Sequence, residues 1–313
     1  MSIIAGMVLS LTVMLLTVVY TRRRLLSRHI PAAALTEPDT EVYPVGAGYL
    51  IRRSGLTPGR TVIVVPGLLE NPGYFTGYYQ SPDLELIMLS ATGYHPPCST
   101  ANARSAAWCS IPSLPCGTIA ADAQLLNLAL EHLVSTTDVR VHGHSRGAAV
   151  VLEAAQQRPD LFDSLEVILE APLLPQGQPA IPSTRLGNWL LPLFHLLWQR
   201  SPRLLLKRPI WGPLQSPGKR AMLLNLPFNV RSSQVLLTNL QDLAQWMTVT
   251  GPEIYRHVKR GAVLIPEEDR ILRPQAMLNS AHRAENLQLI RVTASSHFVL
   301  QDHPESIPPL NGS

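Results

Sequence analysis

One serine lies in a pattern of residue types that can do chemistry. Residues 143–147 read G-H-S-R-G, with Ser145 at the centre, between an apolar run and an alanine-rich run. A serine hydroxyl attacks a carbonyl carbon and forms an acyl intermediate when a neighbouring base takes its proton. A glycine turn that holds an incidental serine has the same five letters, so the surrounding elements must decide between the two interpretations.

The elements on either side of Ser145 favour the nucleophile. Residues 138–143 are typical of a buried strand, and residues 146–157 are typical of a helix. A strand, a sharp turn at G-x-S-x-G and a helix together form a nucleophile elbow. Gly143 and Gly147 allow the strand and the helix to approach closely, and the start of the helix places free N–H groups beside the reacting oxygen.

Two later segments supply the base and the orienting carboxylate that such a serine needs. EEDRILRP follows a predicted strand at 261–266 and contains Asp269, and SSHFVLQDHPE follows one at 287–292 and contains His297. The chain order serine, acid, histidine is the order expected after a nucleophile elbow. We therefore predict Ser145 as the nucleophile, His297 as the general base and then acid, and Asp269 as the residue that orients the imidazole.

Other residues compete for these roles. Glu267 and Glu268 adjoin Asp269 and are alternative carboxylates, while Asp242 stands in a predicted helix of an insertion. Of the other histidines, we expect His144 to pack or to border the pocket and His303 to face solvent, and no context supports His142, His257 or His282.

The order of apolar runs predicts the fold. The predicted strands are 61–65, 84–90, 138–143, 165–171, 261–266 and 287–292, and the predicted helices include 119–134 and 146–157. Such alternation indicates parallel βαβ units with helices on both faces of the sheet. Apolar residues make up 46% of the 313 residues and charged residues 15%, which excludes a disordered chain. We place the core domain at 45–170 and 251–313.

Taken together, these segments resemble the α/β-hydrolase superfamily of serine esterases, lipases and thioesterases, in a bacterial-type, membrane-anchored form. The likeness spans roughly residues 45–305 and lies in the G-x-S-x-G turn and in the EEDRILRP and SSHFVLQDHPE segments. It implies an α/β-hydrolase fold, a mostly parallel sheet with an inserted helical lid, and a catalytic triad at Ser145, His297 and Asp269. It implies no cofactor and no metal ion.

The resemblance also implies an oxyanion hole made of two backbone N–H groups. Arg146, the residue after the serine, and Leu68, in the loop PGLLENPGYF, are the expected donors. Two departures from the family pattern stand out. Pro66 precedes Gly67 where the family has His-Gly, and the helix that usually follows the histidine is expected to be short or absent, because Pro308 and Pro309 resist helix formation.

An insertion, predicted at 171–250, breaks the alternation. Residues 171–241 contain no Asp or Glu, but they contain eight basic residues (Arg185, Arg200, Arg203, Lys207, Arg208, Lys219, Arg220 and Arg231) and several Trp, Phe and Leu. The insertion falls between two strands, so we expect a lid over the carboxyl ends of the sheet, where such folds bind ligands. Its charge has three interpretations: contact with an anionic membrane leaflet, recognition of an anionic substrate such as a phosphorylated acyl thioester, or plain solubility.

The N-terminus is apolar. Residues 1–21 contain no charged side chain and are followed by Arg22, Arg23 and Arg24, and about 20 apolar residues suffice to cross a bilayer. Because the positive charge follows the apolar run, we predict an uncleaved single-pass anchor at 1–24, a linker at 25–44 and a cytoplasmic domain. A cleaved signal is the alternative. Three cysteines (Cys98, Cys109 and Cys116) without metal-ligand spacing favour inert roles.

The predicted function is hydrolysis of an ester or thioester with an apolar, lipid-like acyl group (a carboxylic ester hydrolase), through an acyl-enzyme. Acyl transfer to another acceptor would use the same residues. A binding protein of this fold without catalysis is the alternative from another class. We expect a membrane and a small acyl substrate as partners. We do not expect nucleic acid, because the basic block is rich in Leu and Pro and lacks a recognised motif.

Overall fold

A computed structural model describes residues 3–32, 40–101, 103–110, 114–182, 184–207 and 209–310. Eight strands form one sheet in the order β1-β2-β4-β3-β5-β6-β7-β8. They are β1 (Glu41–Val45), β2 (Gly48–Arg53), β3 (Arg60–Val65), β4 (Leu84–Ser90), β5 (Val139–His144), β6 (Glu166–Glu170), β7 (Gly261–Pro266) and β8 (Gln288–Val292). β1 and β2, and β2 and β4, pair antiparallel, and every later pair is parallel.

The six predicted strands correspond to β3–β8. β4 and β5 are buried along their whole length, and β3, β6 and β7 are buried at all but their first residue, as expected of strands covered on both faces. The hairpin of β1 and β2 was not predicted, and β1 lies within the segment predicted as a linker. β1 contains Pro44, which has no N–H group to donate. An edge strand such as β1 tolerates a proline because the N–H groups on its outer side need no partner.

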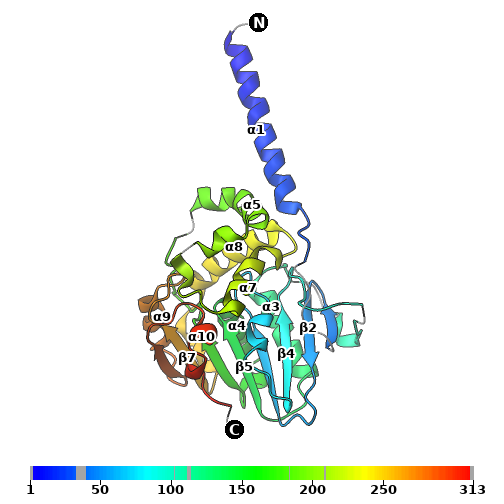
Figure 1. The fold of residues 1–313 in the computed structure, drawn as a ribbon, viewed down its shortest axis with the longest axis vertical. Helices are drawn as coiled ribbons and strands as arrows, with labels where there is room; N and C mark the ends of the chain where they lie inside the picture. Colours follow the sequence, from blue (N-terminus) through cyan, green and yellow to red (C-terminus); the bar gives the residue numbers. More distant parts are fainter. Residues whose placement is uncertain are drawn as a thin grey trace.

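Helices cover both faces of the sheet (Figure 1). α3 (Ile119–His132) and α4 (Arg146–Gln157) pack on one face, within a core that also takes side chains from strands and from the lid. On the other face, a second core joins the residues of α2 (Gly73–Thr76) and α10 (Val299–Asp302) to the sheet. α9 (Pro274–Ala281) connects β7 to β8 along the chain. Short 3-10 turns occur at Ala107–Cys109, Pro159–Phe162, Pro209–Trp211, Leu226–Phe228, Pro252–His257 and Pro304–Ser306.

Four helices between β6 and β7 make up the lid: α5 (Arg185–Arg200), α6 (Arg203–Leu206), α7 (Pro217–Asn225) and α8 (Ser233–Val249). Figure 1 shows them gathered at one end of the sheet. Hydrogen bonds tie them to the domain. The Asn229 side chain donates to Leu69 O (2.7 Å), in the loop after β3, and Asp242 of α8 accepts from Ile119 N (2.7 Å), at the start of α3.

A long helix, α1 (Ile3–Ser27), projects from the lid end of the domain (Figure 1). Its segment Ala5–Ser27 is long and apolar enough to cross a membrane and is not buried in the domain, although a signal sequence has the same properties. The structure gives the ends of the elements around the anchor predicted at 1–24 and the linker predicted at 25–44. The helix continues to Ser27, Ile30 is buried and donates to Arg231 O (2.9 Å), and β1 begins at Glu41. Residues 33–39 of the predicted linker lie outside the described residues.

Candidate active site

Ser145 occupies a strained turn between β5 and α4. Its backbone angles are φ 52° and ψ −117°, in the left-handed range of φ that side chains rarely adopt. The conformation is held from β6: Ser145 N donates to Glu170 O (2.9 Å), and Leu173 N donates to Ser145 O (3.0 Å). Strain of this kind costs about 1–3 kcal/mol and persists where the surrounding structure enforces it.

Glycines at both ends of the turn are required by close packing. A Cβ at Gly147 would lie 2.1 Å from Val65 O, and a Cβ at Gly143 would lie 2.7 Å from Gly147 O. Neither distance leaves room for a methyl group. The two glycines therefore let α4 begin directly against the end of β3, which is where the predicted oxyanion loop starts.

Strand register brings the candidate residues to one edge of the sheet. Val65 pairs with Gly143 across β3 and β5, and His144 pairs with Glu170 across β5 and β6. Pro266 pairs with Val292 across β7 and β8. The loops that follow these paired residues hold Ser145, Asp269 and His297.

Asp269 and His297 are hydrogen-bonded to each other. His297 Nδ1 lies 2.6 Å from Asp269 Oδ2, and both side chains are buried. The other carboxylate oxygen of Asp269 accepts from Ile271 N (2.7 Å) and Leu272 N (3.0 Å), which fixes the carboxylate in one orientation. Because a carboxylate only accepts, Nδ1 of His297 carries the proton, and Nε2 of the neutral ring is left as the acceptor.

The competing carboxylates lie elsewhere. Glu267 pairs with Arg291 at the surface (2.6 Å), and the Glu268 side chain is exposed. Asp242 belongs to α8 and accepts from the first amide of α3. Of these acids, Asp269 is the one that contacts His297 in the described part of the chain.

His144 is buried and packs among aromatic rings, and it also links two loops. Its Nδ1 lies 2.8 Å from Glu70 Oε2 and its Nε2 lies 2.9 Å from His297 O. The rings of His144 and His297 are 4.9 Å apart between centroids. Burial alone would lower the pKa of His144, but the carboxylates of Glu70 and Glu170 outweigh it and raise the pKa to about 9.

Glu70, in the loop PGLLENPGYF, is a buried acid to which the sequence analysis gave no role. Its side chain is buried, and the same Oε2 that meets His144 accepts from Gly67 N (2.8 Å). The signal in the sequence was weak: an acid three residues after Gly67, close enough to fold back onto the glycine amide. Glu70 therefore braces the loop where the family has a histidine before the glycine.

Glu170 is a second buried acid that the sequence interpretation missed. Its carboxylate accepts from Tyr74 OH (2.5 Å) and Leu300 N (2.7 Å) and contacts His142 Nε2 (3.1 Å). Burial would raise the pKa of Glu170, but His144, His142 and these hydrogen bonds lower it to about 2. Glu170 thus connects the end of β6 to α10, which directly follows His297.

The predicted oxyanion donors stand at the expected places in the chain. Arg146 is the first residue of α4, and its buried side chain turns away to Asp122 (2.6 Å). In the loop after β3, the amides of Gly67, Leu69 and Glu70 all donate within the protein. Within the described residues, the Leu68 amide has no such acceptor.

A buried lysine ties the lid to the histidine loop. Lys219 Nζ, in α7, lies 2.7 Å from Asp302 Oδ1 and 3.0 Å from Ser296 Oγ. The other oxygen of Asp302 accepts from Ser296 N (3.1 Å). Lys219 also stands 5.2 Å from the centroid of the Phe298 ring. The residues on both sides of His297 are therefore held by a cation that belongs to the lid.

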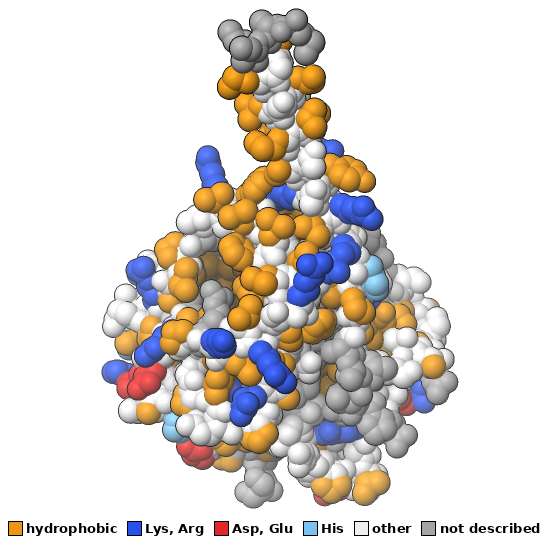
Figure 2. Space-filling model, turned by 45° about the horizontal axis from the view of Figure 1, so that its top comes forward, with side chains coloured by type: hydrophobic (Ala, Val, Ile, Leu, Met, Phe, Trp, Pro, Cys, Tyr) orange, Lys and Arg blue, Asp and Glu red, His pale blue; other side chains and the backbone are white. Residues whose placement is uncertain are grey.

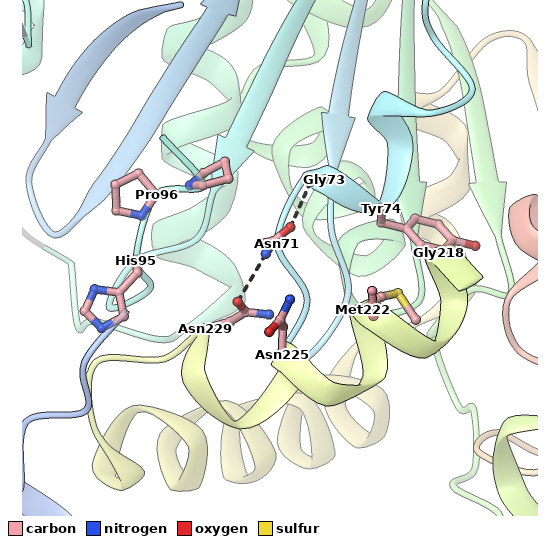
Figure 3. A pocket seen from close by; sticks show the side chains of 11 residues that line it. Asn71, Gly73, Tyr74, His95, Pro96, Gly218, Met222, Asn225 and Asn229 are labelled. Carbon is pink, nitrogen blue, oxygen red and sulfur yellow. Dashed lines mark hydrogen bonds between the residues drawn. The ribbon is translucent and has the colours of Figure 1, made fainter. Parts of the chain in front are cut away.

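A cavity of about 170 Å³ opens between the lid and the loop after β3 (Figure 3). Figure 3 shows Asn71 and Asn229 next to each other in its lining, with Nδ2 of Asn71 3.1 Å from Oδ1 of Asn229. Met222 and Asn225 of the lid also line it. Tyr74, which also lines the cavity, stacks on His144 with 4.7 Å between ring centroids, so one ring links the cavity lining to the turn that holds Ser145.

The remaining histidines and cysteines have structural surroundings. His142 is buried and contacts Tyr79 OH (2.8 Å), and its pKa is lowered by burial. His303 is half-exposed and contacts Glu305. Within the described residues, no disulfide joins Cys98, Cys109 and Cys116. No cluster of three or more His, Cys, Asp or Glu side chains suited to a metal ion occurs among the described residues.

Comparisons with known proteins agree with this fold. A model of the alpha/beta hydrolase family matches residues 56–307. An esterase from Exiguobacterium antarcticum superposes with a TM-score of 0.61 at 12% identity, covering 85% of this chain and 95% of its own. A thermophilic esterase from Thermogutta terrifontis gives 0.59 at 16% identity, covering 86% and 94%. No curated protein sequence matches the chain.

The N-acyl homoserine lactonase AidH, solved in complex with N-butanoyl homoserine, has a TM-score of 0.56 at 11% identity and covers 86% of this chain and 93% of its own. At such identities the structures share the fold alone. The protein has the α/β fold of a hydrolase, with a nucleophile-elbow turn and a mostly parallel eight-stranded sheet. The chain belongs to the alpha/beta hydrolase family, whose esterase and lactonase neighbours support a hydrolase activity.

Proposed function

We propose that the protein is a serine hydrolase that cleaves an ester or thioester of an apolar acyl group. The observation that carries the proposal is the 2.6 Å hydrogen bond between buried His297 and Asp269, at the sheet edge where Ser145 stands in a strained turn. Such an edge is where the fold presents a nucleophile, a base and an orienting acid together. The apolar, aromatic lid favours an acyl substrate over a polar one.

In the proposed reaction, His297 Nε2 takes the hydroxyl proton of Ser145 while Oγ attacks the substrate carbonyl carbon. The amides of Leu68 and Arg146 bind the oxygen that becomes negative, and Asp269 stabilises the imidazolium. The C–O or C–S bond breaks, His297 returns the proton to the leaving alcohol or thiol, and the acyl group stays on Ser145. Water, deprotonated by His297, then releases the acid and restores the hydroxyl.

Two other functions use the same fold. An acyltransferase would replace water by an alcohol or amine at the second step, with unchanged residues. A binding protein without catalysis would need no hydrogen-bonded acid and histidine, so the contact between Asp269 and His297 favours an enzyme.

We further propose that α1 anchors the enzyme as a single membrane-spanning helix with the catalytic domain in the cytoplasm. Ala5–Ser27 is long and apolar enough for this role. Arg22, Arg23 and Arg24 stand on the domain side of the apolar residues, and positive residues stay on the cytoplasmic side of a membrane helix.

A substrate panel tests the proposed function. The purified full chain, in detergent, is assayed with p-nitrophenyl esters of increasing chain length and with acyl-CoA thioesters, alongside Ser145→Ala as a matched control. We expect turnover of at least one series, with a preference for longer acyl chains, and near-complete loss in the variant. Equal rates in both proteins would contradict a serine mechanism. Faster ester consumption on adding an alcohol, with formation of a new ester, would support the acyltransferase.

A further inference from the structure

Lid helix α5 turns an apolar face outward. Leu186, Trp189, Leu193, Phe194 and Leu197 follow one another at helical spacing, and each is between 39% and 66% exposed. Within the described residues of α5, Leu191, Pro192 and His195 are buried and face the domain. A helix on the surface of a soluble domain normally places its apolar stripe inward. The outward stripe needs an apolar partner of its own.

The same face is continuous with the anchor. α1 and α5 pack against each other, and side chains from both helices line an apolar cavity of about 220 Å³ that includes Val18, Trp189 and Leu193. In Figure 1, α5 lies beside the base of α1 and runs roughly crosswise to it, and Figure 2 shows apolar side chains running from α1 onto the top of the lid. An amphipathic helix that lies flat in a membrane interface has this orientation relative to a spanning helix.

Arginines set the depth of α5 relative to α1. Arg22, the first charged residue after the apolar run, donates from Nε to Trp189 O (3.0 Å), and its guanidinium stands 6.0 Å from the Trp189 ring centroid. Arg28 hydrogen-bonds Gln199 near the other end of α5. The first arginine after a spanning segment lies at the headgroups, and tryptophan prefers the same depth. Trp189 therefore lies where the headgroups begin.

The charge around this face has one sign. Arg23, Arg24, Arg185, Arg200 and Arg203 are exposed around α5 and the end of α1, and the chain has no Asp or Glu between residues 171 and 241. Figure 2 shows blue side chains at the margin of the apolar surface. Anionic phospholipid headgroups are the partner that matches an apolar centre with a basic margin.

We propose that the outer face of α5 docks into the headgroup layer of an anionic bilayer, beside α1, and holds the lid against the membrane. The inference rests on the proposed anchoring by α1 and not on the proposed catalysis. The bilayer fills the groove between α1 and α5 with acyl chains. The lid, which also carries Lys219 to the histidine loop, is thereby positioned at the surface from which an acyl substrate would come.

Tryptophan quenching in bilayers tests the proposal. The full chain is placed in nanodiscs of phosphatidylcholine brominated on the acyl chain near the headgroup, with and without phosphatidylglycerol. We expect Trp189→Phe to remove most of the fluorescence quenched by bromine, and phosphatidylglycerol to increase that quenching in the unmodified chain. Trp108→Phe is the matched control, because Trp108 stacks on His132 at the end of α3 remote from the lid.

A second pair of variants checks the apolar face itself. Leu193→Glu with Leu197→Glu should lower the quenching of Trp189, whereas Val249→Glu, a change of an exposed apolar residue at the end of α8, should not. Unchanged quenching in Trp189→Phe would overturn the proposal. Protection of Trp189 from both brominated lipid and aqueous acrylamide would also overturn it, because a protein partner or a second copy would then cover α5. Repeating the measurement on Ser145→Ala separates docking from catalysis, since docking is expected to persist.

Discussion

The imidazole of His144 lies 2.9 Å, at Nε2, from the backbone carbonyl oxygen of His297, and its Nδ1 meets the carboxylate of Glu70 at 2.8 Å. Both partners only accept hydrogen bonds, so both ring nitrogens must carry protons and His144 is an imidazolium. Its charge is balanced within the protein by Glu70 and Glu170. The residue before the nucleophile thus joins the loop after β3 to the loop of the general base.

Because His144 must stay protonated to form this ion pair with Glu70, we expect the free energy of unfolding to fall at alkaline pH. A histidine whose pKa is raised on folding adds stability that is complete below the unfolded value of 6.5 and is lost as pH rises through about 9. We expect the melting temperature to fall between pH 7 and pH 9.5. In Glu70→Gln, which removes the carboxylate that supports the charge, this part of the fall should disappear. Thermal melts of both proteins across this range measure it, and parallel curves would contradict the ion pair.

Asp269→Asn should reduce kcat by about four orders of magnitude, as expected when the general base takes the wrong tautomer. The amides of Ile271 and Leu272 would hold the single side-chain oxygen of the introduced asparagine, so its NH₂ group would face His297 Nδ1. The ring would then carry its proton on Nε2 and could not accept one from Ser145. Steady-state kinetics check this, with Glu268→Gln as the control that should keep its activity.

Lys219→Met should destabilise the protein by about 3–5 kcal/mol, because it leaves the buried carboxylate of Asp302 without its cation. The same variant should lower kcat, since Ser296 and the histidine loop lose their tie to the lid. Urea unfolding and kinetics provide the two measurements. Arg220→Met, an exposed change one residue away, should alter neither, and a similar loss in that variant would refute a specific role for Lys219.

Gly147→Ala should destabilise the fold by more than about 2 kcal/mol, because its Cβ would meet Val65 O at 2.1 Å. Gly218→Ala, in α7, is the control, since its Cβ would approach nothing closer than 3.5 Å. Chemical denaturation of the two variants compares them directly. Equal stability would mean that the strand and the helix are not packed as tightly at the elbow as described.

The parallel part of the fold was predictable because its strands are buried runs of apolar residues, such as 61–65. The sharp turn at Ser145 was predictable because Gly143 and Gly147 flank the serine between a strand and a helix. Asp269 and His297 were predictable because chain order places them after consecutive strands. The burial of Glu70 and Glu170 was not predictable. In the sequence, a buried acid cannot be distinguished from any other acid in a loop or at the end of a strand, because its tertiary partners are not known. The structure shows the contact between Asp269 and His297, but the roles of all five residues in catalysis stay predictions that experiment must test: Ser145, Asp269, His297, Leu68 and Arg146.

The most direct test of the central claim is covalent labelling of the native full chain with a fluorophosphonate, read by intact mass and peptide mapping. We predict one adduct, on the peptide that contains Ser145, with its rate of formation greatly reduced in His297→Ala. An unmodified native protein, or an adduct that forms equally fast in Ser145→Ala, would contradict the assignment of Ser145 as a nucleophile activated by His297.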